Sequence, residues 1–221
     1  MKVAIMQPYF LPYIGYFQLL NYVDKFVIYD DIQYTKKGWI NRNRIRTGDM
    51  ITIPIKKASD YLDIQDRFLS DDWSKQRKKL ENKIYSCYIK SENYSEGSSL
   101  LESILHFQEK NLFKFIFNSI NTVNNYLNIH TEIIKSSSLK RSRELKAQDS
   151  VLQICKMLEA DTYVNLTGGR DLYCKNYFEA NNVELKFIEN RYTNTFSIID
   201  LIMNNRKEDV EKAILEKYEI E

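Results

Sequence analysis

Asp30 and Asp31 are the first residues of this chain whose types and position suit catalysis. They follow Lys25–Tyr29, a β-branched and aromatic run that predicts a buried strand. Polar groups just beyond the carboxyl end of such a strand converge on the crevice where open α/β sheets bind ligands. Either carboxylate could act there as a general base. The same two residues would also suit a solvated acidic turn.

The stretch Lys2–Phe17 predicts a strand, a loop and the start of a helix. Its loop contains two of the chain's three prolines together with several tyrosines. Unpaired N–H groups at a helix start attract anions, and aromatic rings with polar edges suit a small-molecule pocket. A turn that only covers the core is the alternative. The candidate substrate-binding residues of this stretch are Gln7, Tyr9, Tyr13, Gly15 and Tyr16.

Residues 36–55 combine a cluster of cations with a glycine-containing turn, which predicts a β-hairpin. Alternation puts the arginines on one face and the asparagines on the other. Arginine and lysine can clamp a phosphate, tryptophan can stack on a base or a sugar, and asparagine can donate to an oxyanion. We therefore expect Asn43 to act in catalysis and the following residues to bind substrate: Lys37, Trp39, Asn41, Arg42 and Arg44. RNA binding is the rival interpretation, but no wider basic surface supports it.

Two later segments end strands in a similar way. Thr131–Lys135 leads into three serines, and Thr162–Val164 is followed by two glycines, which permit close backbone approach to a ligand. The candidate substrate-binding residues here are Ser137, Gly168, Gly169 and Tyr173. Parallel strands with right-handed crossovers bring their carboxyl ends to one edge, so a shared rim is expected. The residues expected on that rim are Gln7, Asp30, Ser136 and Gly168.

Strands alternate with helices along the chain, which predicts an α/β fold: a mostly parallel sheet covered by helices, in a nucleotidylyltransferase-like or Rossmann-like order. We expect a single α/β domain over residues 1–221, with residues 36–128 as an inserted β-hairpin and helical segment. The remaining predicted elements are helices at 16–23, 70–83, 98–105, 112–127, 147–158, 197–203 and 207–217, and a strand at 184–188.

The composition argues against several classes of protein. The 32 lysines and arginines nearly balance 30 aspartates and glutamates, so no global field draws the protein to nucleic acid or to an anionic membrane. No apolar run approaches the length of a membrane span, and the chain leads from Met1 directly into a strand. A cytoplasmic protein is therefore expected.

The cysteines and histidines offer little material for catalysis or metal binding. Cys87, Cys155 and Cys174 are far apart, and His106 and His130 lie beside apolar residues. This pattern predicts no metal site, no disulfide, no bound cofactor and no histidine-activated nucleophile. Cys155 lies in an apolar helical stripe and is predicted to be a buried, inert thiol.

The helix predicted at 70–83 has one strongly basic side, formed by Lys75, Arg77, Lys78 and Lys79. Most charged faces of this kind are only solvated. The alternative is a docking face for an acidic acyl or peptidyl carrier protein.

Several of these segments together resemble the WbqC-like family: Met6–Phe17, Asp30–Tyr34, Gly38–Arg44, Gly168-Gly169 with Leu172-Tyr173, and Phe196–Asp200. The resemblance covers nearly the whole chain, and its first and third motifs are long and specific. It implies a bacterial transferase that adds an acyl or aminoacyl group, such as glycyl, to a nucleotide-linked amino sugar. The pathway it implies is the biosynthesis of O-antigen lipopolysaccharide or another surface polysaccharide.

One departure from the family pattern bears on activity. Members often carry a histidine shortly after the tryptophan that Trp73 matches, whereas Gln76 and Arg77 occupy that region here. If that histidine is catalytic in the family, this protein uses another base or lacks the activity.

Amide formation needs an activated acyl donor, a base and donors for the oxyanion. Because the chain offers no clear nucleophile, we expect direct transfer from a coenzyme A or carrier-protein thioester. A nucleotidylyl or adenylyl transferase is one alternative: Tyr13-Ile14-Gly15-Tyr16 is similar to the His-x-Gly-His pattern of those enzymes, with tyrosines for both histidines. A non-catalytic sugar-nucleotide-binding protein of the same pathway is the other.

Overall fold

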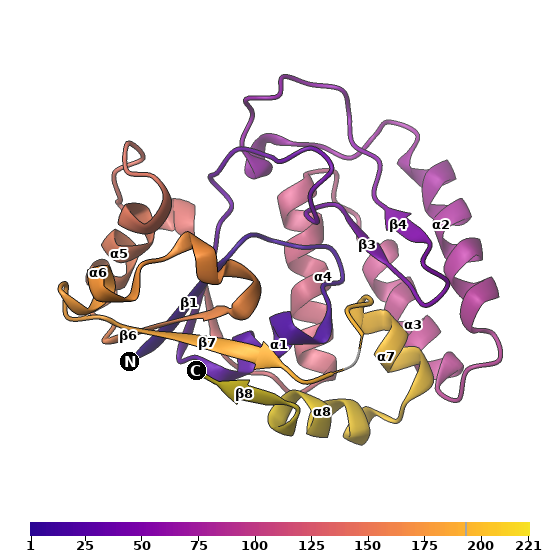
Figure 1. Ribbon diagram of the computed structural model, residues 1–221. Helices are drawn as coiled ribbons and strands as arrows, with labels where there is room; N and C mark the ends of the chain where they lie inside the picture. Colours follow the sequence, from indigo (N-terminus) through magenta and orange to yellow (C-terminus); the bar gives the residue numbers. More distant parts are fainter. Residues whose placement is uncertain (193) are drawn as a thin grey trace.

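The computed structural model describes residues 1–192 and 194–221 and has at its centre a six-stranded sheet of order β5-β2-β1-β6-β7-β8 (Figure 1). The first five strands in this order pair in parallel, and β8 pairs antiparallel with β7. The strands are β1 (Lys2–Met6), β2 (Lys25–Ile28), β5 (Glu132–Lys135), β6 (Thr162–Leu166), β7 (Glu184–Asn190) and β8 (Tyr218–Ile220). The predicted α/β class with a mostly parallel sheet is therefore confirmed.

Helices cover both faces of the sheet because its central strands are apolar on both sides. On β1, Val3 and Ile5 belong to one buried cluster and Ala4, between them, belongs to the other. The first cluster includes residues of α5 (Ala147–Met157) and α6 (Lys175–Glu179), and the second includes residues of α1 (Ile14–Tyr22) and α8 (Lys207–Glu216). Successive side chains of one strand thus hold two separate helical layers.

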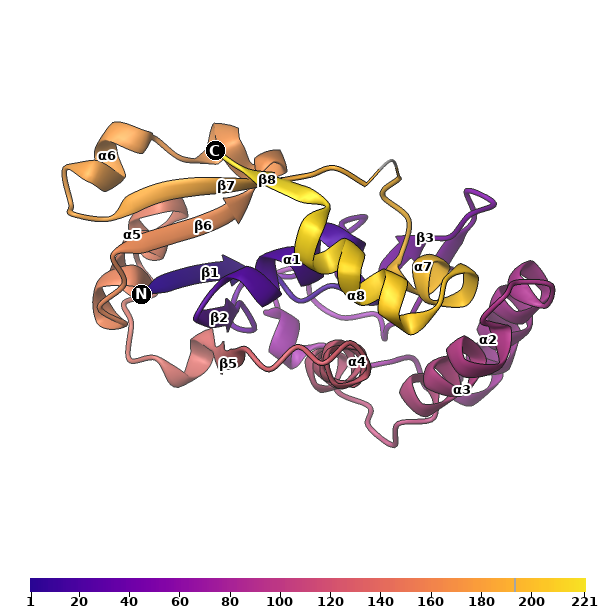
Figure 2. The same ribbon diagram turned by 90° about the horizontal axis from the view of Figure 1, so that it is seen from below.

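The chain between β2 and β5 forms a largely helical extension of the sheet. It contains the antiparallel pair β3 (Arg42–Arg44) and β4 (Met50–Thr52), then α2 (Trp73–Tyr88), α3 (Tyr94–Leu105) and α4 (Leu112–Tyr126). Figures 1 and 2 place α2 and α3 at the opposite end of the molecule from α5 and α6. The helix α7 (Ile198–Asn204), which follows β7, returns to this extension and packs on α3.

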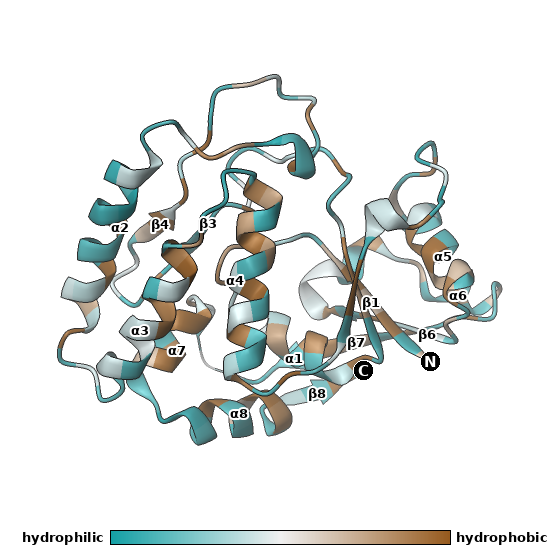
Figure 3. Cartoon of the chain, turned by 180° about the vertical axis from the view of Figure 1, so that it is seen from behind, coloured by the Kyte–Doolittle hydropathy of each residue, from teal (hydrophilic) through white to brown (hydrophobic). Residues whose placement is uncertain are grey.

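One continuous apolar core joins the extension to the sheet. The core that begins at Ala4 and Leu20 continues through Ile116 of α4 to Ile202 of α7. Apolar and polar residues alternate along α4 (Figure 3), and its buried side carries the 3.6-residue spacing seen in the sequence. The insertion predicted at 36–128 therefore shares its core with the rest of the chain.

The elements agree with the predicted ones in kind and order, but some bounds differ: α2 ends at Tyr88 rather than at residue 83, and α3 begins at Tyr94 rather than at residue 98. Three further features also differ. The paired part of the hairpin is shorter than the alternating sequence suggested, because only Arg42–Arg44 and Met50–Thr52 pair. Gly168 and Gly169 lie in a 3-10 turn, Thr167–Leu172, rather than in a loop that leads directly into a helix. The short edge strand β8 was not predicted.

No helix of residues 1–192 and 194–221 is both long and apolar enough to span a bilayer.

Candidate active site at the ends of β1, β2 and β6

A cavity of about 1020 Å³ opens at the carboxyl ends of β1, β2 and β6. The chain continues from β1 to β2 on one side and returns to β6 on the other, so the order of strands reverses here. Open α/β sheets bind ligands at such a reversal, because the loops after the two central strands diverge and leave a crevice. The volume is at the upper end of the range typical of small-molecule sites.

The loop after β1 supplies an aromatic wall. Gln7, Tyr9 and Tyr13, three of the candidate substrate-binding residues, line the cavity. Gly15 acts indirectly: a Cβ there would lie 2.5 Å from the ring of Tyr13, so glycine leaves the space that this ring occupies. Tyr16 is fully buried beside Tyr9, with ring centroids 5.9 Å apart, and supports the wall from behind.

The tyrosines of this site are hydrogen-bond donors at neutral pH. Burial raises the pKa of Tyr13 to about 12, and burial also raises the pKa values of Tyr9 and Tyr173. Tyr173 lies across the cavity after β6, where it accepts a hydrogen bond of 3.1 Å from the Tyr163 hydroxyl. None of these phenols is a ready base, so they can orient a ligand but not take a proton from it.

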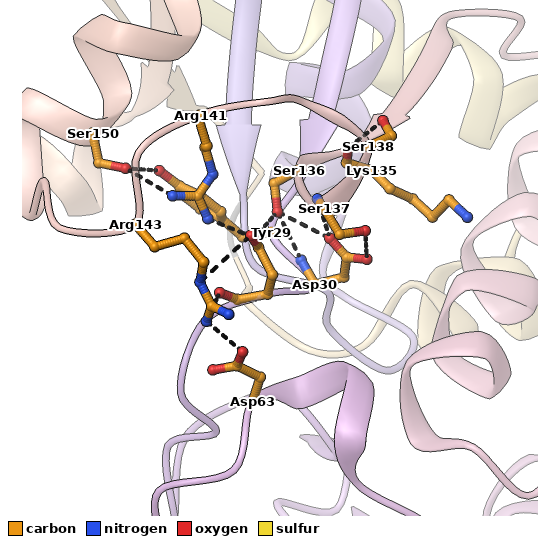
Figure 4. Close-up of polar contacts among 11 residues, drawn as sticks. Tyr29, Asp30, Asp63, Lys135, Ser136, Ser137, Ser138, Arg141, Arg143 and Ser150 are labelled. Carbon is orange, nitrogen blue, oxygen red and sulfur yellow. Dashed lines mark hydrogen bonds and ion pairs between the residues drawn. The ribbon is translucent and has the colours of Figure 1, made fainter.

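Of the neighbouring aspartates Asp30 and Asp31, only Asp31 reaches the cavity. Its Oδ1 atom accepts hydrogen bonds from Ser136 Oγ and, at 2.6 Å, from Arg141 Nη2; Figure 4 labels these two donor residues. The pair is well shielded, since the side chain of Arg141 is 4% exposed and that of Asp31 7%. Arg143 donates to the backbone oxygen of Asp31 and bridges to Asp63, which also lines the cavity.

Asp30 points into the protein instead. Its side chain accepts hydrogen bonds from Ser136 Oγ at 2.9 Å, from the Ser137 backbone N–H at 2.9 Å and from the Ser137 hydroxyl. It is 2% exposed and is not part of the cavity lining. Asp30 and Ser137 together fix the turn after β5 against the end of β2, so that Ser136 is held beside Asp31.

The loop before α5 closes the cavity with positive charge. Arg141 stacks on Tyr29, with its Cζ atom 5.2 Å from the ring centroid, and Tyr29 hydrogen-bonds Ser150 of α5 at 3.0 Å. Lys146 and Ala147, at the start of α5, also line the cavity. The cavity therefore carries three cationic side chains and two carboxylates, an excess of one positive charge.

The hairpin contributes one aromatic ring to the cavity, and its asparagines instead bond to backbone carbonyl oxygens. Trp39 lines the cavity, whereas Asn41 and Asn43 are buried elsewhere. The Nδ2 atoms of these asparagines donate to the carbonyl oxygens of Ile53 and Leu11, at 2.7 and 2.6 Å respectively. We had expected Asp30, Asn43, Gln7 and Gly169 to line one pocket. Only Gln7 and Gly169 line the cavity, so the structure does not place Asp30 and Asn43 there.

The cations of the hairpin are also outside the lining. Arg42 donates through Nε to Gly38 O at 2.9 Å and through Nη2 to the carbonyl oxygen of Lys37, and Arg44 lies over the Trp39 ring at 5.5 Å. Lys37 is exposed. Substrate binding by these three residues stays a prediction.

Gly168 and Gly169 both line the cavity, but they differ in their surroundings. A Cβ on Gly168 would meet no atom within 4 Å, whereas a Cβ on Gly169 would lie 3.1 Å from the Nδ2 atom of Asn165. That Nδ2 donates to Tyr163, and the Oδ1 atom of Asn165 accepts from the Leu166 N–H. Glycine at 169 therefore lets the turn pass close to a fixed carboxamide.

Sequence reasoning missed Arg141, Arg143, Lys146 and Asn165. A signal for the first three was present, because the segment 140–146 contains four cations directly before a helix and after a strand. Asn165 lies inside β6 and gave no such signal.

Among residues 1–192 and 194–221 no three His, Cys, Asp or Glu side chains gather as metal ligands do. Cys155 is buried, as predicted, and burial raises its pKa to about 12.

The fold and the cavity define an α/β protein with a polar and aromatic small-molecule site at its topological switch point. The chain belongs to the WbqC-like protein family, whose profile matches residues 7–212. It is 28% identical over 220 residues to Uncharacterized protein Rv1507c of Mycobacterium tuberculosis (strain ATCC 25618 / H37Rv), covering 92% of this chain and 93% of that protein. No solved structure is significantly similar to it.

Proposed function

We propose that this protein transfers an acyl or aminoacyl group, such as glycyl, to the amine of a nucleotide-linked sugar. The observation that carries the proposal is the Asp31 carboxylate, held by Ser136 and Arg141 on the wall of a cavity with tyrosines on its other sides. A carboxylate fixed in this way can hold a sugar ammonium group and accept its proton, while the rings cover the faces of the sugar.

The reaction needs no covalent intermediate on the protein. The ammonium group loses a proton to Asp31, and the free amine attacks the carbonyl carbon of a thioester. A C–N bond forms, the C–S bond breaks, and the leaving thiolate takes up the second proton, which the nitrogen loses as it becomes the amide. Asp31 releases the first proton to water. Hydrogen-bond donors on the cavity wall, of which Gln7 and Tyr173 are examples, would stabilise the oxyanion of the tetrahedral intermediate.

The chain belongs to the WbqC-like family. Because resemblance to this family implies the biosynthesis of O-antigen or another surface polysaccharide, family membership supports that role.

The thioester donor is coenzyme A or a carrier protein. The basic face of α2, with Lys75, Lys78 and Lys79 exposed, could meet an acidic carrier. Figures 1 and 2 place α2 far from the ends of β1 and β6, which favours a donor that does not dock on this helix.

Nucleotidylyl transfer is the second candidate, favoured by the parallel order β5-β2-β1-β6-β7. The tyrosines at the two histidine positions weigh against it. Tyr16 is fully buried in the core and cannot reach a phosphate. Tyr13 is a neutral phenol at physiological pH, as an ordinary tyrosine is, and burial raises its pKa further to about 12.

A turnover assay with the two aspartate variants tests the proposal. UDP-linked amino sugars and acyl or glycyl thioesters are incubated with the protein, and the amide is detected by mass spectrometry. Asp31→Asn should lower turnover by about 100-fold, the loss typical of a general base, while sugar-nucleotide binding persists. Asp209→Asn is the control, since Asp209 is exposed on α8 and lies outside the cavity, and this variant should keep turnover. Equal turnover in the wild type and Asp31→Asn would contradict the role of Asp31. A wild type that binds the sugar nucleotide but forms no amide would be better described as a non-catalytic binding protein.

A further inference from the structure

Arg141 is a buried cation whose charge is only partly used inside the protein. Its Nη2 atom meets Asp31 at 2.6 Å, its Nη1 atom makes a long contact of 3.4 Å with Ser150, and its Nε atom is buried without a hydrogen-bond partner. Asp31 is shared, because Arg143 approaches its Oδ2 atom at 4.0 Å. A buried guanidinium usually satisfies its donors, so this one is prepared for a further acceptor.

The start of α5 adds a second source of positive potential at the same place. The helix has 11 residues, its N-cap residue Lys146 makes no side-chain capping bond, and Lys146 and Ala147 line the cavity beside Arg141. The free N–H groups of a first helical turn, together with the helix dipole, favour an anion. Lys146 is exposed and takes part in no ion pair among the residues that the structure describes.

The mouth of the cavity is aromatic and apolar instead. Tyr61 is 86% exposed and Trp39 is 44% exposed, although both rings line the cavity. Leu172, another exposed apolar residue, lies at the same rim. Exposed rings beside a charged interior suit a ligand with a planar group at one end and a phosphate at the other.

From these features we infer that Arg141, Lys146 and the start of α5 form the diphosphate subsite of the cavity, with the nucleobase held at Trp39 and Tyr61. The inference rests on the proposed function, because it assumes a nucleotide-linked substrate. It also moves the diphosphate from the hairpin arginines to the loop before α5, since neither Arg42 nor Arg44 lines the cavity, whereas Arg141 does. The cationic excess of the lining favours the negatively charged diphosphate.

Calorimetric titration with UDP, inorganic pyrophosphate and uridine tests this subsite. The wild type should bind UDP and pyrophosphate, and uridine more weakly. Arg141→Lys should weaken UDP and pyrophosphate by about tenfold or more, because a point charge lacks the guanidinium fork. Lys146→Ala should weaken both by about threefold, as expected for one exposed charge. Uridine binding should not change in either variant.

Matched variants sharpen the result. Lys140→Ala removes an exposed lysine outside the cavity and should leave all three affinities unchanged. Trp39→Ala should weaken UDP by about tenfold but leave pyrophosphate unaffected, because stacking holds only the base. Circular dichroism checks that Arg141→Lys is folded; if it is not, Lys146→Ala alone decides.

Three outcomes would overturn the inference: a wild type that binds UDP no better than uridine, unchanged UDP affinity in both Arg141→Lys and Lys146→Ala, or loss of UDP only in Arg42→Ala and Arg44→Ala. Each of these is separate from a failure of the proposed function. A protein that binds UDP through Arg141 yet never forms an amide would keep the subsite and lose the transferase.

Discussion

Two segments of this chain have the same pattern of an arginine, a small polar residue and a second arginine, and the structure uses them in opposite ways. In Arg42-Asn43-Arg44 the extended strand β3 turns the central asparagine into the core, where it holds Leu11 O. In Arg141-Ser142-Arg143 the irregular loop brings both arginines to Asp31, and Ser142 is exposed. Backbone conformation, rather than residue type, decides which member of the triplet is buried.

The comparison explains why the sequence predicted anion-binding residues in the hairpin and none in the later loop. A cluster of cations beside a tryptophan is typical of an anion site, but in a two-stranded hairpin alternate side chains must point away from the core. The loop before α5 has no such constraint. It can therefore turn both charges toward a single carboxylate, at the edge where β2 ends.

The largest expected effect comes from removing Arg141. Arg141→Ala leaves Asp31 in a shielded site without its partner, and breaking a buried pair typically costs about 3–5 kcal/mol of the free energy of unfolding. Arg42→Ala, the first arginine of the other triplet, should cost about 1 kcal/mol or less because it bonds only to carbonyl oxygens of its own turn. Urea denaturation of both variants measures the difference, and equal losses would show that the triplets do not differ in this way.

The central residues should show the reverse order. Asn43→Ala leaves the Leu11 carbonyl buried without a side-chain donor, and we expect a loss of about 1–3 kcal/mol. Ser142→Ala changes an exposed hydroxyl, so its midpoint in urea should stay within about 0.5 kcal/mol of the wild type. A loss in Ser142→Ala as large as that in Asn43→Ala would remove the contrast between strand and loop.

The glycine turn after β6 offers a test of the opposite cavity wall. Gly169→Ala pushes a methyl group against Asn165, which is fixed by two hydrogen bonds, and should lower stability by about 1 kcal/mol. Gly168→Ala is the matched control, because no atom lies within 4 Å of its added methyl group, and its melting temperature should stay close to that of the wild type. Similar melting temperatures for the two variants would mean that Asn165 yields freely.

The smallest expected effect belongs to the second arginine of the loop. Arg143 is 57% exposed, so its pair with Asp63 is screened by water and salt. Arg143→Ala should cost about 1 kcal/mol or less at low ionic strength and almost nothing in 1 M salt, whereas the loss in Arg141→Ala should persist. Denaturation at two salt concentrations measures both losses. A loss in Arg143→Ala that does not depend on salt would mean that the Arg143–Asp63 pair behaves like the buried Arg141–Asp31 pair.

Much of the fold could be predicted because local patterns carry it. The apolar run Lys25–Tyr29 and the helical spacing along Leu112–Tyr126 show which side chains must be buried. The strand and the helix form where these patterns predict them. The position of the cavity agrees with the same reasoning, since loops after parallel strands meet at one edge. Tyr9, Tyr13 and Gly169 line the cavity for that reason.

The roles of individual side chains could not be predicted in the same way. Asp30 and Asp31 are neighbours of one type, and only the turn after β5 decides that Ser137 binds the first while Arg141, 110 positions away, meets the second. The sequence by itself determined the alternation of strands and helices, because burial of apolar surface acts through local periodicity. Only the tertiary structure decided which charges face one another, because an ion pair depends on distances between atoms that the order of residues along the chain does not fix.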